Sequence, residues 1–373
     1  MNKFIGAFLV LSVFLSSCSQ QTAKEDVQQE YVTQSDLAFK PRQYVAYKAI
    51  SPVKVDGIID EDSWSKAPWT EYFEDIEGDI KPKPLHSAHA KILWDETYLY
   101  ISAELEEPHV WATLRQRDTI IFYDNDFEVF IDPDGDTHNY YEFEMNAFGT
   151  EWDLLLAKPY RDGGPAINGW NINGMKVAVK VYGSINDPSD VDEKWSLEIA
   201  MPWKILKECA PESRAPKAGE QWRIDFSRVQ WTTDIIDGKY VKRKDPDSGK
   251  PLPENNWVWS PQGVINMHLP ELWGYVQFSD LIVGQGEEIF IENPDEEIKL
   301  KLRKLYYSQK NYFERNQKFA SNIEDLGVSG DFEKSFVGSI QIETTTNLFE
   351  IIVPATKMGE TLHIRQDGRV WKD

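Results

Sequence analysis

Alternating hydrophobic and polar residues dominate the chain between residues 44 and about 280. Within residues 127–132, Phe127, Val129 and Ile131 occupy every second position. This period of two places one face of a strand against a core. The same pattern predicts further strands at residues 88–94, 98–106, 141–146, 175–183, 194–202, 221–230 and 273–279. Many short strands with one apolar face each predict a mainly β protein, an antiparallel β-sandwich or jelly roll.

Helical periods are confined to a few segments. Hydrophobic residues recur at steps of three and four through residues 295–320, which predicts an amphipathic helix. A three-strand meander is expected after it, at residues 338–344, 348–353 and 361–365. We therefore expect a small C-terminal α+β module over residues 294–373, packed on the sandwich or hinged to it. Two more short helices are expected at residues 61–66 and 202–209.

The chain begins with a segment typical of secretion. Lys3 supplies a positive charge, and an apolar run follows from Phe4 to Leu15. This run is too short to span a membrane and predicts a signal peptide over residues 1–17. The sequence Leu-Ser-Ser-Cys that ends at Cys18 resembles the lipobox of bacterial lipoproteins, in which cleavage leaves a lipidated cysteine. An ordinary signal peptide with an incidental cysteine is the alternative.

The segment after Cys18 is polar and has no sustained period, so residues 18–43 are expected to form a flexible linker. Glu25 and Asp26 partly match the acidic export signal of surface lipoproteins in Bacteroidota. We expect an outer-membrane lipoprotein on the periplasmic or cell-surface face, held to the membrane through its lipid alone. With lipid on Cys18, Cys209 has no partner for an intrachain disulfide.

The charge of the chain excludes one class of partner. With 40 basic and 62 acidic residues, the formal charge is −22. An acidic protein lacks the basic face that nucleic acid requires, so no nucleic acid partner is expected. Aromatic residues make up 13% of the chain. Most of these rings are expected to fill a β core, and some to form flat platforms for a ligand such as a sugar ring.

Several stretches resemble the family 9 carbohydrate-binding module. They are VKVDGIIDEDSW at residues 53–64, AKILWDETYLYISAELE at residues 90–106 and DNDFEVFIDPDGDTHNYYEFEMNAFG at residues 124–149. Residues 195–203 and the closing PELWGYVQF at residues 270–278 follow in the order that the family shows. The resemblance places the domain at residues 44–283. It implies a β-sandwich that binds polysaccharide or oligosaccharide and assists glycan capture or carbohydrate catabolism.

The resemblance also implies a binding site, in which two tryptophan rings clamp a sugar and a Glu, an Asn and an Arg supply hydrogen bonds. By motif, Glu128 matches the Glu and Asn146 matches the Asn. Glu144 stands where the Arg is expected, so this site departs from the family pattern. The first ring falls near Phe122 and Tyr123, and the second falls near His268. The expected ligand-contacting residues are Glu128, Asn146, Phe122, Tyr123, Glu144, Trp259, His268 and Trp273.

A second polar motif lies between two predicted strands. Asp132, Asp134 and Asp136 alternate with Pro and Gly, and their oxygens suit Ca²⁺. The motif fails the EF-hand pattern because its sixth position is Thr137 and its twelfth is Phe143. A polar turn without metal is the alternative. Structural calcium is the one cofactor that we consider.

Two other functions remain open at this stage. Glu128, Glu142 and Glu144 share one strand face, and paired carboxylates about 5–10 Å apart can hydrolyse glycosidic bonds. A glycoside hydrolase with Glu128 as its first candidate is therefore one alternative, although a non-enzymatic role is preferred. The other alternative is a scaffold that binds no sugar and uses residues 294–373 as a surface for a protein partner.

Overall fold

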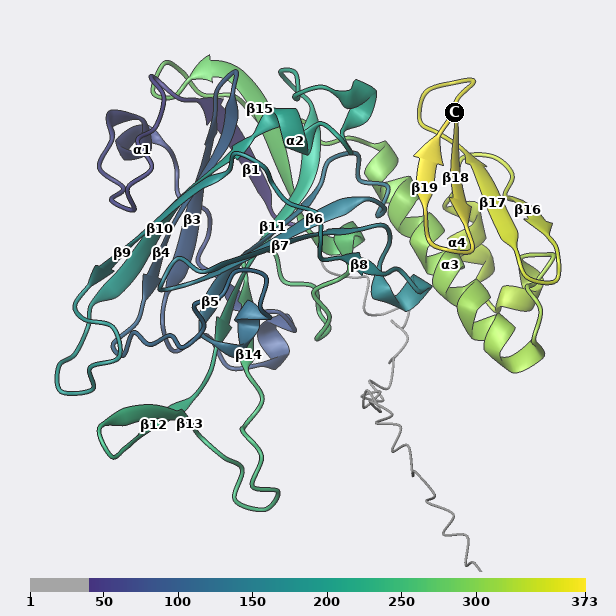
Figure 1. The fold of residues 1–373 in the computed structure, drawn as a ribbon. Coiled ribbons are helices and arrows are strands. Elements are labelled where there is room, and N and C mark those ends of the chain that lie inside the picture. The colour runs from purple at the N-terminus through teal and green to yellow at the C-terminus, as the bar shows by residue number, and fades with distance from the viewer. Residues whose placement is uncertain (1–39) are drawn as a thin grey trace, which may run out of the picture. The chain divides into compact units, whose positions relative to one another are not determined.

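The computed structural model describes residues 40–373, and these are mainly β-structure (Figure 1). The predicted signal peptide, Cys18 and most of the predicted linker lie outside the described residues. The expected fold class is confirmed: two sheet layers enclose a core, and a small α+β module follows at the C-terminal end.

The two layers belong to one continuous path of strands. The first layer contains, in spatial order, β8 (Ala166–Ile167), β7 (Glu151–Leu156), β6 (Tyr140–Asn146), β5 (Asp126–Asp132), β11 (Gln221–Gln230) and β15 (Gly274–Ile282). The second layer contains β3 (Ala88–Trp94), β4 (Tyr98–Glu106), β10 (Lys194–Pro202) and β9 (Lys176–Tyr182). Strand β1 (Gln43–Lys48) lies between β15 and β3 and connects the layers.

Strand β1 departs from the antiparallel arrangement that the sequence predicts. It runs parallel to β15, with Tyr44 opposite Val276, and parallel to β3, with Tyr47 opposite Leu93. Neighbouring strands elsewhere on the path are antiparallel. Hydrophobic alternation reports which face of a strand is buried and carries no information on strand direction, so the sequence could not reveal this pairing.

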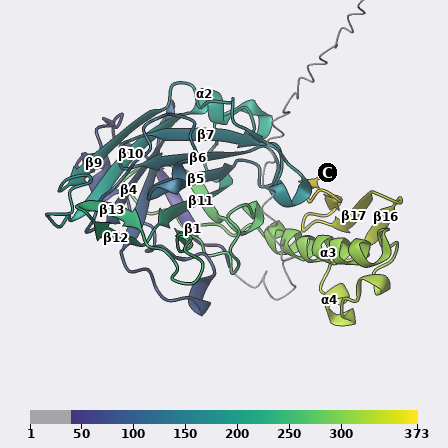
Figure 2. The same cartoon turned by 60° about the horizontal axis from the view of Figure 1, so that its bottom comes forward.

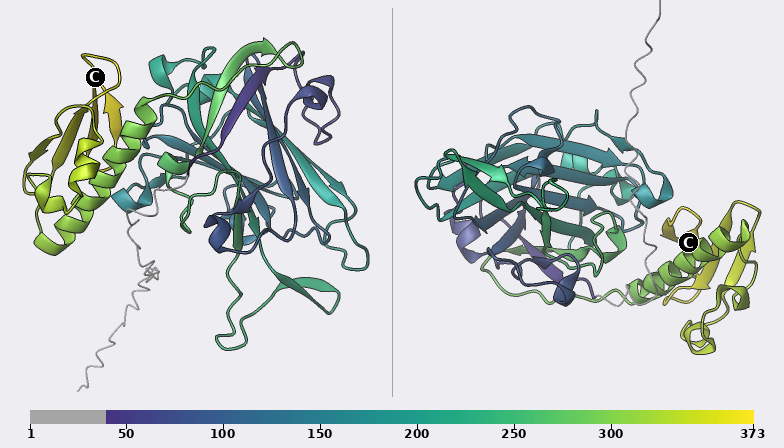
Figure 3. Two further views of the ribbon diagram at one scale, coloured as in Figure 1. Left: turned by 180° about the vertical axis from the view of Figure 1, so that it is seen from behind. Right: turned by 90° about the horizontal axis from the view of Figure 1, so that it is seen from below.

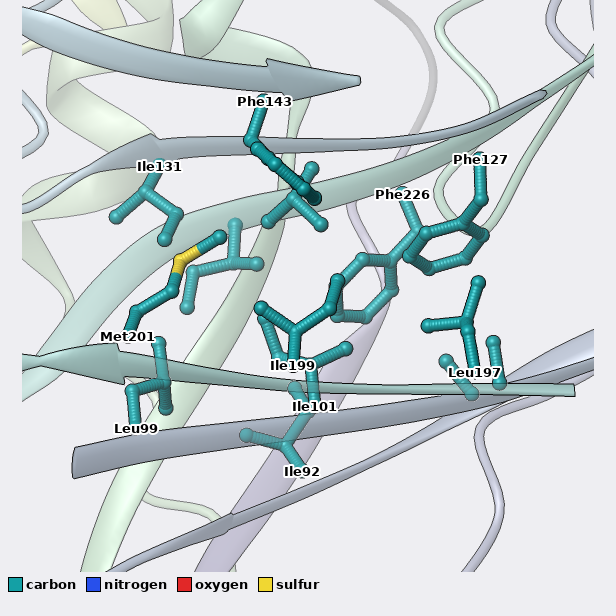
Figure 4. Packing of buried hydrophobic residues seen from close by; sticks show 14 of the residues in the cluster. Ile92, Leu99, Ile101, Phe127, Ile131, Phe143, Leu197, Ile199, Met201 and Phe226 are labelled. Carbon is teal, nitrogen blue, oxygen red and sulfur yellow. The ribbon is translucent and has the colours of Figure 1, made fainter. Parts of the chain in front are cut away.

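The core lies between the layers. Figure 4 shows Phe127, Phe143 and Phe226 of the first layer packed against Ile101 and Ile199 of the second, and all five are buried. Burying a side chain of this size stabilises the fold by about 1.5–3 kcal/mol. Because successive strand residues point to opposite faces, filling this core turns their neighbours on β5 and β6 outward.

The remaining elements of the sandwich are short (Figures 2 and 3). They are α1 (Asp62–Lys66), α2 (Trp203–Leu206), β2 (Glu74–Asp75), β14 (Asn255–Val258), the hairpin of β12 (Thr233–Ile236) and β13 (Lys239–Lys242), and single 3-10 turns at Gly78–Ile80, Ile121–Tyr123, Tyr160–Asp162, Pro211–Ser213 and Pro270–Leu272. Of these, β14 pairs with both β11 and β2. Two of the 3-10 turns, Ile121–Tyr123 and Tyr160–Asp162, border the site described below.

The C-terminal module packs a long helix against a small antiparallel sheet. Its elements are α3 (Asp295–Asn316), a 3-10 turn at Glu324–Leu326, α4 (Gly330–Lys334), β16 (Gln341–Thr344), β17 (Phe349–Pro354), β18 (Thr361–Arg365) and β19 (Val370–Lys372). The sheet has one strand more than predicted, namely β19. This strand has only three residues, which are too few to show an alternating pattern in the sequence. The helix ends before residue 320, at a left-handed Gln317.

Contacts between side chains join this module to the sandwich. Leu269 and Leu272 belong to the same hydrophobic cluster as the apolar face of α3. Arg223 of β11 forms an ion pair of 2.9 Å with Glu296 of α3. Within residues 40–373, every helix is too short or too polar to cross a lipid bilayer.

Candidate functional site

Carboxylates gather on the outer face of strands β5 and β6. Asp126 and Glu128 of β5 and Glu142 and Glu144 of β6 point away from the core, because their neighbours along each strand fill it. Glu128 stands directly opposite Glu144, and the two residues are only 6% and 1% exposed, respectively. Like charges directly opposite each other destabilise a sheet, so this pairing is costly for folding. We call these four residues the acidic face.

The acidic face lacks positive counter-charges. Among the described residues, no Lys, Arg or His forms an ion pair with any of the four carboxylates. Burial raises the pKa of each of them, and it raises that of Glu128 to about 7. Repulsion from Glu128 further raises the pKa values of Asp126, Glu142 and Glu144. These carboxyls therefore keep protons at a higher pH than free acids do, and a protonated carboxyl both donates and accepts hydrogen bonds.

Several polar atoms of this face are left without partners in the described part of the chain. Glu144 Oε2 accepts a hydrogen bond of 3.0 Å from the backbone N–H of Phe122, and Asp126 Oδ1 accepts one of 3.3 Å from Val229. Asp126 Oδ2, Glu142 Oε2 and the hydroxyl of Ser227 are buried and have none. Buried polar groups are rarely left unpaired in folded proteins, so these atoms are available to a ligand.

Aromatic rings border the acidic face. Trp152 of β7 is half-buried and stands opposite Glu144 on the same face. Tyr123, in the turn Ile121–Tyr123, is 52% exposed, and Phe122 packs edge-on against it. Tyr160 is 48% exposed, and burial together with repulsion from Glu142 and Glu144 raises its pKa. Partly exposed rings beside hydrogen-bonding groups can contact a ligand that has both apolar faces and polar groups.

A lysine from the β12–β13 hairpin contacts this aromatic border. Lys242 Nζ lies 3.2 Å from the centre of the Trp231 ring and 5.6 Å from that of Tyr123. Burial lowers the pKa of Lys242 to about 8. The indole N–H of Trp231 donates to the carbonyl of Phe122 at 2.8 Å, which fixes the turn that carries Phe122 and Tyr123. The hairpin therefore supports the rings on one side of the acidic face.

The structure places the other predicted rings differently. His268 lies near Tyr160, at 4.5 Å between ring centres, and its Nδ1 is 3.0 Å from the Tyr140 hydroxyl. Trp273 is fully buried, and its N–H donates to the Met267 carbonyl. Trp259 is also fully buried, and its N–H donates to Glu71. Neither tryptophan presents a ring face to solvent, so neither can serve as a platform.

The side chain of Asn146 uses all of its hydrogen-bonding positions within the protein. Its amide nitrogen donates to the Leu114 carbonyl and to Asp124, and its oxygen accepts from the backbone N–H groups of Phe148 and Thr150. An asparagine side chain offers two donors and two acceptor positions, so all are used. Asn146 therefore holds the turn after β6 and is not among the residues that we propose for ligand contact.

The loop that carries Asp132, Asp134 and Asp136, here called the aspartate loop, does bring its carboxylates together. One oxygen from each of Asp132, Asp134 and Asp136 lies within 4.8 Å of the others, which suits a hard cation. However, Asp132 accepts from two backbone N–H groups, and Asp136 forms an ion pair of 2.8 Å with Arg369. Calcium at this loop stays a prediction, since the loop is already stabilised by these contacts.

Sequence reasoning missed several residues of the site. Asp126 follows the same alternation as Glu128 and could have been found by extending the strand by one residue. Trp152 lies in a strand that the pattern did not predict, because Leu154, Leu155 and Leu156 interrupt the alternation. Tyr160 and Lys242 lie in a turn and a hairpin, and no local signal connects them to β5 and β6.

Comparison with known proteins gives one family match. The model for the carbohydrate family 9 binding domain-like family matches residues 55–215, which include β5, β6 and β7. No match was found among curated proteins.

Solved structures similar to this chain include family 9 carbohydrate-binding modules from Caldicellulosiruptor kristjanssonii. The complex with cellotriose is 14% identical, covers 66% of this chain and 99% of its own, and has a TM-score of 0.41. The complex with glucose is 13% identical, covers 66% and 98%, and has a TM-score of 0.40. A candidate carbohydrate-binding protein from Bacteroides uniformis ATCC 8492 is 16% identical, covers 64% and 100%, and has a TM-score of 0.45. The resemblance that the sequence motifs indicate over residues 44–283 is thus matched by a family model over residues 55–215.

Proposed function

We propose that this protein binds carbohydrate on the outer face of β5, β6 and β7. One observation carries the proposal: the partly exposed rings of Trp152, Tyr123 and Tyr160 border buried carboxyls with unused hydrogen-bonding atoms. The rings and carboxyls all lie within the region that matches the family 9 domain.

In this proposal, the two kinds of group have separate tasks. The rings stack against the apolar C–H faces of a sugar, and Glu128, Glu142 and Glu144 exchange hydrogen bonds with its hydroxyls. Because carboxyls with raised pKa values can be protonated, they can serve as donors as well as acceptors. We expect modest affinity, since a sugar buries little apolar area and its hydroxyls compete with water for partners.

Binding of the mature protein to a glycan array tests this proposal. Trp152→Ala removes a platform and Glu128→Gln changes a hydrogen-bonding group, so each is expected to weaken binding at least tenfold. The matched control is Tyr72→Ala, because Tyr72 is 60% exposed but stacks on His89 of β3, in the other layer. Binding by none of the proteins, or equal losses in all three variants, would contradict the proposal.

The same array tests whether binding occurs without hydrolysis. We propose that the protein is not an enzyme, so mass spectrometry should recover the captured glycans at their original length. Shortened glycans from the wild type, and intact ones from Glu128→Gln, would instead identify a hydrolase.

We also propose that Cys18 carries lipid and holds the protein in the outer membrane for glycan capture and catabolism, with residues 294–373 available to a protein partner. The support is the sequence ending at Cys18, which lies outside the described residues. Cells grown with an alkyne fatty acid should label the wild type and not Cys18→Ser, and the label should follow the outer-membrane fraction. Equal labelling of both proteins would contradict the anchor.

A further inference from the structure

Three carboxylate oxygens of the acidic face have the spacing that one ammonium group requires. One oxygen from each of Asp126, Glu128 and Glu144 lies within 4.8 Å of the others. An ammonium has three N–H donors at tetrahedral angles, and its hydrogen bonds to carboxylates measure about 2.7–2.9 Å. Two acceptors of one ammonium are therefore about 4.4–4.7 Å apart. The sheet holds this spacing, because Glu128 and Glu144 stand opposite each other on paired strands and Asp126 precedes Glu128 on the same face.

These oxygens receive no positive charge from the described part of the chain. Its ion pairs include no Lys, Arg or His beside Asp126, Glu128 or Glu144. Lys242 lies at the border of this face, but its Nζ stacks over the Trp231 ring and pairs with no carboxylate of the described residues. Asp126 Oδ2 is buried, and no described group donates a hydrogen bond to it. Because buried charges in proteins are normally paired, a positively charged group on the ligand is the partner that fits.

The position of Trp152 determines which part of a sugar reaches these oxygens. Trp152, Glu144 and Glu128 form one row across strands β7, β6 and β5. Residues that stand opposite each other on one face of a sheet have Cβ atoms about 4.5–5.5 Å apart. A sugar ring stacked on Trp152 therefore brings the substituents of its edge beside Glu144. An amine at this edge offers three donors and a charge, whereas a hydroxyl offers one donor and no charge.

We propose that the glycan bound at this site carries free amino groups, and that Asp126, Glu128 and Glu144 hold the ammonium of a glucosamine-type residue. The inference rests on the proposed function and names the class of sugar that the same site prefers. In the free protein, burial and repulsion between carboxylates raise the pKa values of these three groups and favour their protonated forms. A bound ammonium offsets the repulsion, so the carboxyls give up their protons and accept charge-assisted hydrogen bonds.

Two oligosaccharides that differ in charge test the proposal. Chitosan oligomers carry an ammonium on their glucosamine residues at pH 6, and chitin oligomers of the same length carry a neutral N-acetyl group instead. Calorimetry should show the wild type binding chitosan oligomers at least about tenfold more tightly, because hydrogen bonds to charged groups are about twice as strong as neutral ones. Asp126→Asn removes one carboxylate and should reduce this preference to about threefold or less. Asp331→Asn, at an exposed position of α4, is the matched control and should keep the preference.

Further variants separate the preference for an amine from carbohydrate binding itself. Glu144→Gln should lower the preference as Asp126→Asn does, which keeps the test valid if circular dichroism shows that one variant does not fold. Trp152→Ala should weaken the binding of both oligomers and keep their ratio. Equal or tighter binding of chitin oligomers by the wild type, binding of other glycans but of neither oligomer, or binding of methylamine as tight as that of chitosan oligomers would overturn the amine preference and leave carbohydrate binding standing. Binding of no glycan on the array would instead contradict the proposed function.

Discussion

Arg161 and Glu271 form a buried ion pair, in which Arg161 Nη2 lies 3.0 Å from Glu271 Oε2. The other oxygen of Glu271 accepts a hydrogen bond of 2.6 Å from the hydroxyl of Tyr307 on α3. One carboxylate therefore connects the turn Tyr160–Asp162, the turn Pro270–Leu272 and the long helix of the C-terminal module.

This ion pair predicts a loss of stability in acid. Burial alone would raise the pKa of Glu271, but Arg161, Arg303 and the Tyr307 hydroxyl lower it to about 2. A lowered carboxyl pKa contributes stability that is complete above the unfolded value of 4.5 and is lost as the pH falls toward 2. We expect Glu271→Gln to cost about 3–5 kcal/mol at pH 7, because Arg161 then stays buried without a counter-charge. Urea unfolding should show this difference shrinking below pH 4, and a difference independent of pH would contradict it.

His268 is expected to stay neutral through the physiological range. Burial, and then repulsion from Arg161, lower its pKa to about 3. For a histidine, this shift gives stability that is present above the ordinary value of 6.5 and is lost as the pH falls toward 3. In NMR titrations, the ring signals of His268, assigned by their loss in His268→Gln, should not change between pH 8 and pH 5. A midpoint near 6 would mean that the ring is solvated.

Glu198 of β10 is expected to be irreplaceable by glutamine. It accepts hydrogen bonds from the Trp64 indole and from the backbone N–H groups of Asp56 and Gly57, each at 2.8 Å. A glutamine at this position would turn its amide N–H₂ group toward these N–H donors, so at least one hydrogen bond would be lost. Glu198→Gln should therefore lower the free energy of unfolding by about 1–3 kcal/mol, as measured by thermal unfolding. Glu193→Gln, at the exposed position directly before β10, is the control and should be neutral. Equal stability of both variants would show that these hydrogen bonds are replaced by water.

Alanine substitutions at two glycines allow the cost of backbone strain to be distinguished from the cost of a steric clash. Gly57 and Gly219 have φ angles of +85° and +82°. A Cβ at Gly57 would lie 2.7 Å from the carbonyl carbon of Val179, whereas one at Gly219 would meet nothing within 4 Å. Gly219→Ala should therefore cost about 1–2 kcal/mol from the left-handed backbone alone. Gly57→Ala should cost at least about 1–3 kcal/mol more, because β9 must move, and similar unfolding midpoints would contradict this.

The sequence pattern predicts the fold well where alternation is uninterrupted. β3, β4, β10 and β11 have the bounds that the hydrophobic period predicts. Turn residues border these strands and one face of each is apolar, so local information determines them. β12 and β13 were missed because their hairpin extends from the sandwich with little buried surface, which leaves the pattern without an apolar face.

The site was predictable in part. The alternation correctly placed Glu128 and Glu144 on one face, because strand parity is a local property. Which rings border that face depends on contacts between distant segments. Trp273 is covered by Phe130 and Tyr140, and Trp259 by Phe226 and Tyr44, so both tryptophans became core residues. Tyr160 instead remains at the surface in a short turn.

The parallel pairing of β1 has a mechanical consequence. β1 is the first described strand; its ladder to β15 runs along its length, and its last two residues, Tyr47 and Lys48, also pair with β3. A pull on the preceding chain acts along the strand axis, so these hydrogen bonds are loaded in shear and share the force instead of opening one at a time. A protein tethered by its N-terminal segment while holding a polymer under flow would therefore take the tension on the strand that joins its two layers.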